Sequence, residues 1–139
     1  MLSELQQLGR AVKQAQYRQH RALESGLSAI GITLAQWDAL RAISRTPGAS
    51  ARALASATFQ SEQAFGALAG RLLAQGWVER RAGHGRRIEH HLTPSGRQVL
   101  RSGHKVADEV LAACFAPLSE KDRAGLLALL HRLSGDGDG

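Results

Sequence analysis

Residues 77–93, WVERRAGHGRRIEHHLT, place four arginines and three histidines around a glycine-rich centre. The flanking runs WVERRA and RIEHHLT are strand-like, and Gly83 and Gly85 lie between them, which predicts a β-hairpin. A basic hairpin of this kind could be a catalytic loop, a metal site or a wing that contacts nucleic acid. The sequence on either side of it decides among these interpretations.

The sequence before the hairpin predicts a helix-turn-helix. Ser50 can cap a short helix over 51–58, and Ser61 can cap a second helix over 62–75 that Gly76 ends. A short helix, a tight connection and a second helix form this motif. Because the basic hairpin follows directly, we predict a winged helix. In such a fold the second helix of the helix-turn-helix enters the major groove of DNA, and the hairpin reaches the phosphate backbone or the minor groove.

Apolar periodicity predicts four more helices around this lobe. Gly26 and Gly31 are expected to interrupt the first of them. Thr93 and Pro94 are favoured residues for the start of the third, which Pro117 breaks. The four helices are predicted over residues 4–24, 33–44, 94–116 and 124–133. The expected fold is therefore mainly α with a small β-hairpin, in a single domain over residues 1–139.

The positive charge is concentrated near the hairpin. The chain has 18 lysines and arginines against 12 acidic residues, a net charge of +6. Residues 71–105 alone hold eight cations and two acids, an excess of six that equals the excess of the whole chain. This distribution favours an anionic partner, with nucleic acid ahead of a membrane surface.

Other features of the composition exclude several classes of protein. No run approaches the roughly 18–20 apolar residues of a membrane span, and the N-terminus lacks a secretory signal pattern. The single cysteine, Cys114, excludes an internal disulfide, so we expect a soluble cytoplasmic protein. We expect Cys114 itself to be a buried packing residue.

The residue pattern disfavours a metal site and an active site. His90 and His91 are adjacent in a predicted strand, so their side chains point to opposite faces and do not readily bind one ion. We expect both imidazoles to be solvated or close to DNA. No Ser-His-Asp, paired-carboxylate or phosphate-loop pattern is found, so we expect neither enzyme activity nor a cofactor or metal.

Three segments resemble the MarR family of transcriptional regulators. They are GITLAQWDALRAI at 31–43, ASARALASATFQSEQAFGALAGRLLAQGWVERR at 49–81 and LTPSGRQVL at 92–100. The last segment is similar to the LTxxG signature of that family, with its threonine at Thr93 and its glycine at Gly96. The order of these pieces around a basic wing makes the resemblance specific.

The resemblance implies a two-fold dimer. Residues 33–93 would form the DNA-binding lobe, and residues 1–30 and 94–134 the helical dimerisation region. Two lobes would bind successive major grooves of a pseudo-palindromic operator, and small phenolic or anionic ligands commonly release such repressors. Our leading hypothesis is a dimeric, sequence-specific repressor of this kind. The alternative is a winged-helix interaction module that binds a protein partner, or nucleic acid without sequence specificity.

The alternative arises because the second helix of the motif is rich in alanine and glycine. Gln63 can pair with adenine, but relatives often place Thr and Arg near positions 66 and 67. Gly66 and Gly70 indicate either close approach to DNA or to another helix, or merely a weak helix. Capping alone would equally explain Ser50. The residues predicted to contact DNA are Ser50, Arg52, Ser61, Gln63, Gly66, Arg80, Arg81, His84, Arg86 and Arg87.

The wing departs from the family pattern at one position. The resemblance implies Asp-x-Arg at this point, and the chain has His84-Gly85-Arg86, so the carboxylate that steadies the arginine is absent. His84 is also free to gain charge near its unperturbed pKa of about 6.5. A mildly pH-dependent affinity for DNA is the resulting hypothesis.

A ligand pocket is implied by the resemblance. In relatives it lies between the dimerisation helices and the winged-helix lobe. Aromatic walls and a cation for an anionic effector would come from Tyr17, His20, Arg21, Trp37 and Arg41. The alternative is that Trp37 belongs to the core and that the other four lie on the dimer surface.

Overall fold

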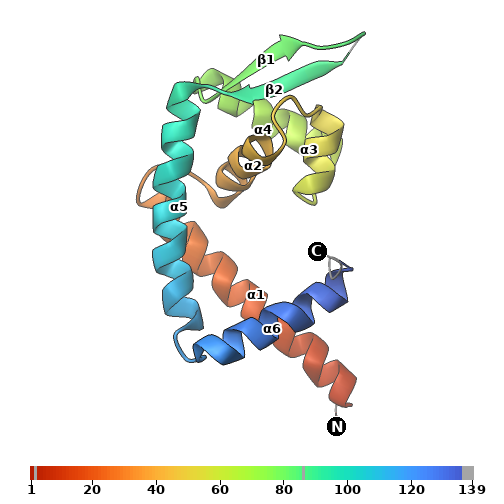
Figure 1. Cartoon of the computed structure of the whole chain (residues 1–139), viewed down its shortest axis with the longest axis vertical. Helices are drawn as coiled ribbons and strands as arrows, with labels where there is room; N and C mark the ends of the chain where they lie inside the picture. The colour runs from red at the N-terminus through yellow and green to blue at the C-terminus, as the bar shows by residue number, and fades with distance from the viewer. Residues whose placement is uncertain (2, 86, 136–139) are drawn as a thin grey trace.

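The computed structural model describes residues 1, 3–85 and 87–135, which form six helices and a two-stranded antiparallel sheet. Figure 1 shows the hairpin and the short helices gathered at one end of α5, with α6 and the start of α1 at the other. The predicted fold class is confirmed. The elements are α1 (Glu4–Ser28), α2 (Leu34–Arg45), α3 (Ala51–Ala57), α4 (Glu62–Ala74), β1 (Val78–Ala82), β2 (Ile88–Leu92), α5 (Pro94–Phe115) and α6 (Glu120–Ser134).

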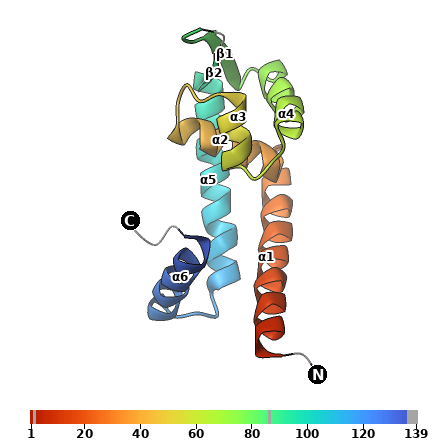
Figure 2. The same cartoon turned by 90° about the vertical axis from the view of Figure 1, so that its right-hand side faces the viewer.

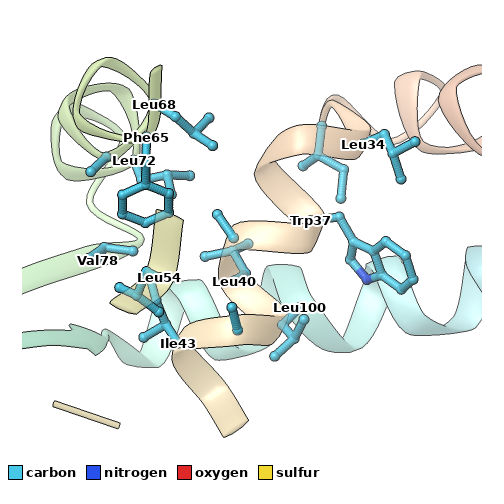
Figure 3. Close-up of a cluster of buried hydrophobic side chains, with 14 of the residues drawn as sticks. Leu34, Trp37, Leu40, Ile43, Leu54, Phe65, Leu68, Leu72, Val78 and Leu100 are labelled. Atoms are coloured by element: carbon cyan, nitrogen blue, oxygen red, sulfur yellow. The ribbon is translucent and has the colours of Figure 1, made fainter. Parts of the chain in front are cut away.

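The core of the winged-helix lobe lies where α2, α3, α4 and the hairpin meet (Figure 3). Leu40, Ile43 and Phe65 are at most 1 % exposed, and Val78 brings the first strand onto the same cluster. Each such side chain contributes roughly 1.5–3 kcal/mol through its removal from water. This shared core fixes the helix-turn-helix and the hairpin relative to one another.

Side-chain caps begin the helices where the sequence predicts them. The hydroxyls of Ser50 and Ser61 accept hydrogen bonds from the backbone N–H groups of Ala53 and Ala64, at 3.2 and 3.1 Å. Such caps contribute about 1 kcal/mol each, because they satisfy N–H groups that the helix leaves free. The first helical turns of α3 and α4 are therefore set locally.

The start of α5 is tied to the end of α4. The Thr93 hydroxyl accepts from Gly96 N–H at 3.0 Å and donates to the Gly76 carbonyl at 2.6 Å, while Thr93 N–H donates to the Trp77 carbonyl at 3.1 Å. A Cβ atom at position 96 would overlap the Trp77 carbonyl oxygen. The Thr93 and Gly96 signature therefore joins the lobe to the long helix.

The hairpin pairs Val78 with Leu92 at its base and Ala82 with Ile88 near its tip. Gly85 adopts the positive φ of +66° that the turn needs and that glycine adopts without strain. On its outer edge β2 also holds the loop before α3. Gly48 N–H donates to the His90 carbonyl at 3.0 Å, and His90 N–H donates to the Ala49 carbonyl at 3.2 Å. The wing and the start of α3 are thus linked.

The first helix is longer than predicted. We expected Gly26 to interrupt it, but α1 continues through Gly26 to Ser28, so that prediction is wrong. A Cβ atom at position 26 would lie 2.8 Å from the side chain of Val110 and 3.1 Å from that of Val106. Gly26 is therefore a point of close helix packing between α1 and α5. Gly31, with φ +82°, lies beyond the end of the helix.

The far helices leave most of their apolar side chains uncovered. Leu23 and Leu27 are the buried residues of α1, and α6 has no buried residue within the described part of the chain. Figure 2 shows α6 beside the far end of α5, away from the lobe. The described helices lack the length and apolar character that crossing a membrane requires. The exposed apolar residues of α1 and α6 include Leu5, Leu8, Val12, Leu127, Leu129, Leu130 and Leu133.

Candidate nucleic-acid interface

The recognition helix of the predicted motif is α4, and two of its three predicted contact residues face solvent, while Gly66 is half-buried. Ser61 and Gln63 are exposed, and Ser61 already serves as the N-cap. Arg52 of α3 pairs with Glu62 at 3.7 Å, with both side chains largely exposed. This pair holds the two helices of the motif together loosely, and it leaves the Arg52 guanidinium accessible to a phosphate.

Gly66 and Gly70 leave one strip of the α4 surface without side chains. A Cβ atom at either position would have no atom of the described residues within 4 Å, outside the helix's own neighbouring backbone. The sequence left open whether these glycines approach DNA or another helix. No other helix of the described chain lies against them. A groove of DNA remains a predicted occupant of that space.

The hairpin carries its cations on an exposed surface. Arg80, Arg81, His84 and Arg87 are all exposed, while Arg86 lies outside the described residues. Arg81 forms an ion pair with Glu79 on the same strand. Arg87 donates to the Gly48 carbonyl at 3.2 Å, so part of its guanidinium binds the loop before α3. Each guanidinium has five N–H donors, and both arginines therefore keep donors for a phosphate.

A carboxylate that the sequence did not predict, Glu89, lies on β2 one residue from the Ala82–Ile88 pair near the tip of the hairpin. Glu89 accepts from His91 Nε2 at 2.9 Å, and this hydrogen bond is the main cause of a lowered pKa for the Glu89 carboxyl. Glu89 also lies against Gly83 and Gly48. The spacing of Glu89 and His91, two residues apart on a strand, was the available signal, because such residues share a face.

His90 is not a surface imidazole. We expected it to be solvated or close to DNA, and this is wrong: its side chain is 2 % exposed. Its Nδ1 lies 3.1 Å from the Ala49 carbonyl, and its ring meets the Phe65 ring edge to face. Among the described residues its Nε2 has no hydrogen-bond partner. Burial lowers the pKa of His90, because a charged imidazole would lose its hydration there.

A cavity of about 410 Å³ lies between α1, α2 and α5. Of the five predicted ligand residues, His20, Trp37 and Arg41 line it, whereas Tyr17 and Arg21 do not. Tyr17 and Arg21 instead pack on each other, with the guanidinium 5.8 Å from the ring centre. The alternative interpretation holds for Trp37, which is 4 % exposed and belongs to the core.

The cation in this cavity already has partners. Arg41 lies 4.3 Å above the Trp37 ring and pairs with Asp38 at 3.4 Å. Burial raises the pKa of Asp38, and the Arg41 charge opposes that rise. Asp38 and Asp108 were not predicted, and neither was His104, whose ring meets Trp37 edge to face. The spacing of His104 and Asp108, four residues apart on one helix, was the available signal.

In the part of the chain that the structure describes, no group of three or more His, Cys, Asp or Glu side chains is placed to hold a metal ion. Cys114 is a free thiol and is half-buried, so it is more accessible than the packing residue we expected.

Comparisons with known proteins agree on one family. The sequence model of the MarR family matches residues 30–88. A probable transcriptional regulator from Pseudomonas aeruginosa is 31 % identical, with 91 % of this chain and 96 % of that chain covered and a TM-score of 0.81. A MarR family protein of Mycobacterium tuberculosis, solved with salicylic acid, is 26 % identical over 91 % of this chain and 95 % of its own, with a TM-score of 0.77.

A third solved structure supports the fold. A MarR mutant from E. coli, complexed with operator DNA, is 24 % identical over 94 % of this chain and 95 % of its own, with a TM-score of 0.84. No curated protein sequence matches the chain.

Proposed function

Because the chain belongs to the MarR family of winged-helix transcription regulators, we propose that it is a sequence-specific DNA-binding repressor that acts as a homodimer. The observation that carries the proposal is the unobstructed outer strip of α4 beside an exposed basic hairpin. Gln63 is exposed at the start of that strip, and Gly66 and Gly70 keep it open. A backbone without side chains can approach base edges closely. The E. coli protein of the same fold was solved with operator DNA.

In this proposal the two parts of the interface have different tasks. The cations Arg80, Arg81, Arg86 and Arg87 neutralise phosphates, with His84 among them. Gln63 reads a base edge in the major groove. Ser50, Ser61 and Arg52 lie at the helix starts, where backbone N–H groups favour phosphate. Phosphate contacts give affinity at any sequence, and so the specificity depends on α4 and on DNA shape.

The homodimer is proposed from the uncovered apolar faces. Leu8 and Val12 of α1 and Leu130 of α6 line a groove of about 420 Å³, and the side chains around it are mostly exposed leucines. Monomeric proteins rarely expose large continuous apolar patches. A second copy of the chain, placing its own α1 and α6 against these faces, would cover them.

Release by a small aromatic or anionic effector is the remaining part of the proposal. The cavity lined by His20, Trp37 and Arg41 spans α1 and α5 on one side and α2 of the lobe on the other. A ligand there would change how the lobe sits on the long helices. The M. tuberculosis relative was solved with salicylic acid and, in another structure, with p-aminosalicylic acid.

The alternative function, an interaction module without sequence specificity, is favoured by one observation. The exposed positions of α4 after Gln63 include Ala64, Ala67 and Ala74, which offer no hydrogen bonds to bases. Charge alone would then hold DNA. Such binding would be equal for all sequences and would fall steeply with salt.

A gel-shift titration separates the two functions. The purified chain is titrated against its own upstream intergenic DNA and against a random duplex of equal length, at two salt concentrations. A preference above about a hundredfold, close to 3 kcal/mol, that survives the higher salt is expected for the repressor. Equal and salt-sensitive binding to both duplexes would contradict it and support the alternative.

Two substitutions test the proposed roles, base reading by Gln63 and phosphate contact by Arg86. Gln63→Ala should cost about 1–3 kcal/mol on the cognate duplex and little on the random one. Gln98→Ala, an exposed glutamine on α5, is the matched control. Arg86→Ala should weaken binding to both duplexes and lower the salt slope by about one. Equal losses on both duplexes for Gln63→Ala would refute its reading role.

The pH hypothesis for His84 uses the same assay. Protonation of this exposed wing residue adds a positive charge, so affinity should rise as the pH falls from 8 to 6 at fixed salt. His84→Gln should remove that rise. Affinity that stays flat in the unmodified protein would rule the hypothesis out.

A further inference from the structure

The carboxylate of Glu89 lies where the hairpin meets the loop before α3. His91 Nε2 donates to Glu89 Oε1 at 2.9 Å, and the two residues share one face of β2. A Cβ atom at position 83 would lie 2.9 Å from Glu89 Oε2, and one at position 48 would lie 3.2 Å from Oε1. The carboxylate is therefore enclosed between the turn of the hairpin at Gly83 and the loop before α3 at Gly48.

Hydrogen bonds from the hairpin hold the same loop. Arg87 donates from Nη2 to the Gly48 carbonyl at 3.2 Å, and Gly48 N–H donates to the His90 carbonyl at 3.0 Å. The turn itself is closed by Gly83 N–H, which donates to the Arg87 carbonyl at 2.8 Å. Ser50, the N-cap of α3, follows Gly48 by two residues. One cluster of contacts thus joins the turn of the hairpin to the start of α3.

The basic segment 71–105 has two acidic residues, Glu79 and Glu89, and their surroundings differ. Glu79 is 44 % exposed and pairs with Arg81 of its own strand. Glu89 is 31 % exposed, and its carboxylate reaches both the turn and the loop before α3. On a surface that binds phosphate, any negative charge lowers affinity. The contacts of Glu89 give it a positional role that can outweigh this effect, and those of Glu79 do not.

We propose that Glu89 is a positioning residue for the wing. Its carboxylate sets the turn of the hairpin against the loop before α3, and so fixes the distance between the cations His84 and Arg87 and the start of α3. This inference rests on the proposed DNA-binding function for its effect on affinity, whereas the contacts themselves belong to the free protein. A wing that is ordered before DNA binds loses less conformational freedom on binding, which favours affinity.

Substitution of the two carboxylates should give effects of opposite sign. Glu79→Ala removes a negative charge from the hairpin, so affinity for DNA should stay unchanged or rise. Glu89→Ala removes the same charge but releases the turn, and should weaken binding to a random duplex about tenfold. Gel-shift titration of the full chain measures both. Affinity of Glu89→Ala equal to or above that of the unmodified protein would overturn the proposal.

Gly83→Ala tests position without a change of charge. The added Cβ atom overlaps the Glu89 carboxylate and should displace it, so binding to the random duplex should again weaken. Gly125→Ala, where a Cβ atom meets nothing within 4 Å, is the matched control and should bind like the unmodified protein. This second variant also covers the case in which Glu89→Ala folds poorly. Full affinity in Gly83→Ala would overturn the proposal.

The salt dependence separates a positional role from a merely structural one. A fraction of unfolded protein lowers the apparent affinity equally at every salt concentration. Loss of a wing contact with phosphate instead lowers the slope of log affinity against log salt by about one. Glu89→Ala should therefore have a lower slope, and Glu79→Ala an unchanged one. A weaker affinity of Glu89→Ala with an unchanged slope would overturn the proposal.

Nuclear magnetic resonance relaxation of the DNA-free protein keeps this proposal separate from the proposed function. Backbone order parameters of Gly83, His84 and Gly85 should lie near about 0.85 in the unmodified chain and in Glu79→Ala, and below about 0.6 in Glu89→Ala. Unchanged order parameters in Glu89→Ala would overturn the proposal. If the unmodified protein bound no DNA, the proposed function would fail, and this measurement would still decide whether Glu89 positions the wing.

Discussion

The winged-helix lobe and the far helices differ in how completely they bury their apolar side chains. In the lobe, α2 alone buries Leu34, Trp37, Leu40 and Ile43, which belong to one core cluster with residues of the short helices, the hairpin and α5. In the far region, α6 buries none of its leucines within the described chain. The lobe therefore has a well-packed core, whereas the described far helices leave an apolar surface exposed to solvent.

The well-packed core of the lobe should be the most sensitive region. Phe65→Ala removes a fully buried ring where α4 packs on the hairpin, and should lower the free energy of unfolding by about 3–5 kcal/mol. Urea unfolding followed by circular dichroism measures this. Leu5→Ala, at a position 77 % exposed, is the control and should cost far less in dilute solution. Similar losses of stability for both variants would show that the buried ring contributes no more than the exposed leucine.

The junction between the regions should be nearly as sensitive. Gly96→Ala forces a Cβ atom onto the Trp77 carbonyl oxygen, and should destabilise the protein by about 3 kcal/mol because backbone has to move. Gly125→Ala in α6, where a Cβ atom meets nothing within 4 Å, is the matched control. It should be neutral or stabilising by up to about 1 kcal/mol. Equal thermal midpoints for the two variants would contradict this account.

A substitution on the exposed apolar face of α1 and α6 should change self-association of the protein rather than its folding. Leu130→Glu places a charge on the apolar groove of α1 and α6, and should weaken self-association at least tenfold. Sedimentation velocity over a concentration series measures it, and the circular dichroism spectrum should stay unchanged. Glu120→Gln, at the exposed start of α6, is the control. A monomeric unmodified protein would refute the proposed dimer.

Acidification should weaken the lobe through His90. The pKa of His90 lies below its ordinary value of 6.5, so the unfolded chain takes up this proton first. The stability from the neutral imidazole is complete above pH 6.5 and is lost as the pH falls below that value toward the folded pKa. Urea midpoints at pH 7.5, 6.5 and 5.5 should fall, with a flatter trend in His90→Leu. The same trend in His90→Leu as in the unmodified chain would exclude His90 as the cause.

The smallest expected effect concerns the turn between α3 and α4. Phe59 adopts φ +58°, which is unfavourable for a residue with a side chain, and its ring is 98 % exposed. Phe59→Gly relieves that conformation and loses no packing, so it should stabilise the lobe by about 0.5–1 kcal/mol, measured by urea unfolding. Phe59→Ala, which keeps the strain, is the control. If Phe59→Gly lowered the free energy of unfolding and Phe59→Ala did not, the backbone at position 59 would not be strained.

Local features of the fold could be predicted from the sequence, because their causes lie within a few residues. Ser50, Ser61 and Thr93 cap their helices through hydrogen bonds to N–H groups three residues away. The hairpin needed only two strand-like runs and the intervening glycines. These interactions join residues that are close in the sequence, so the sequence alone indicates both partners.

Features that depend on distant residues could not be predicted. Gly26 stays helical because Val106 and Val110 pack against it from another helix. His90 is buried because Ala49 and Phe65 enclose it. The cavity between α1, α2 and α5 likewise needs three elements that are separate in sequence. Predicted contacts with DNA remain predictions, since they depend on a partner outside the chain.

The unbroken length of α5 has a mechanical consequence. The helix has 22 residues and therefore spans about 33 Å at 1.5 Å per residue. Its first turn is fastened to the lobe by Thr93 and Gly96, and its last turn adjoins the region of α6. A rotation of about 5° around the far end would carry the first turn about 3 Å sideways over this length. The helix thus acts as a lever arm. A small change in how its far end packs becomes, at its first turn, a displacement as large as the length of a hydrogen bond.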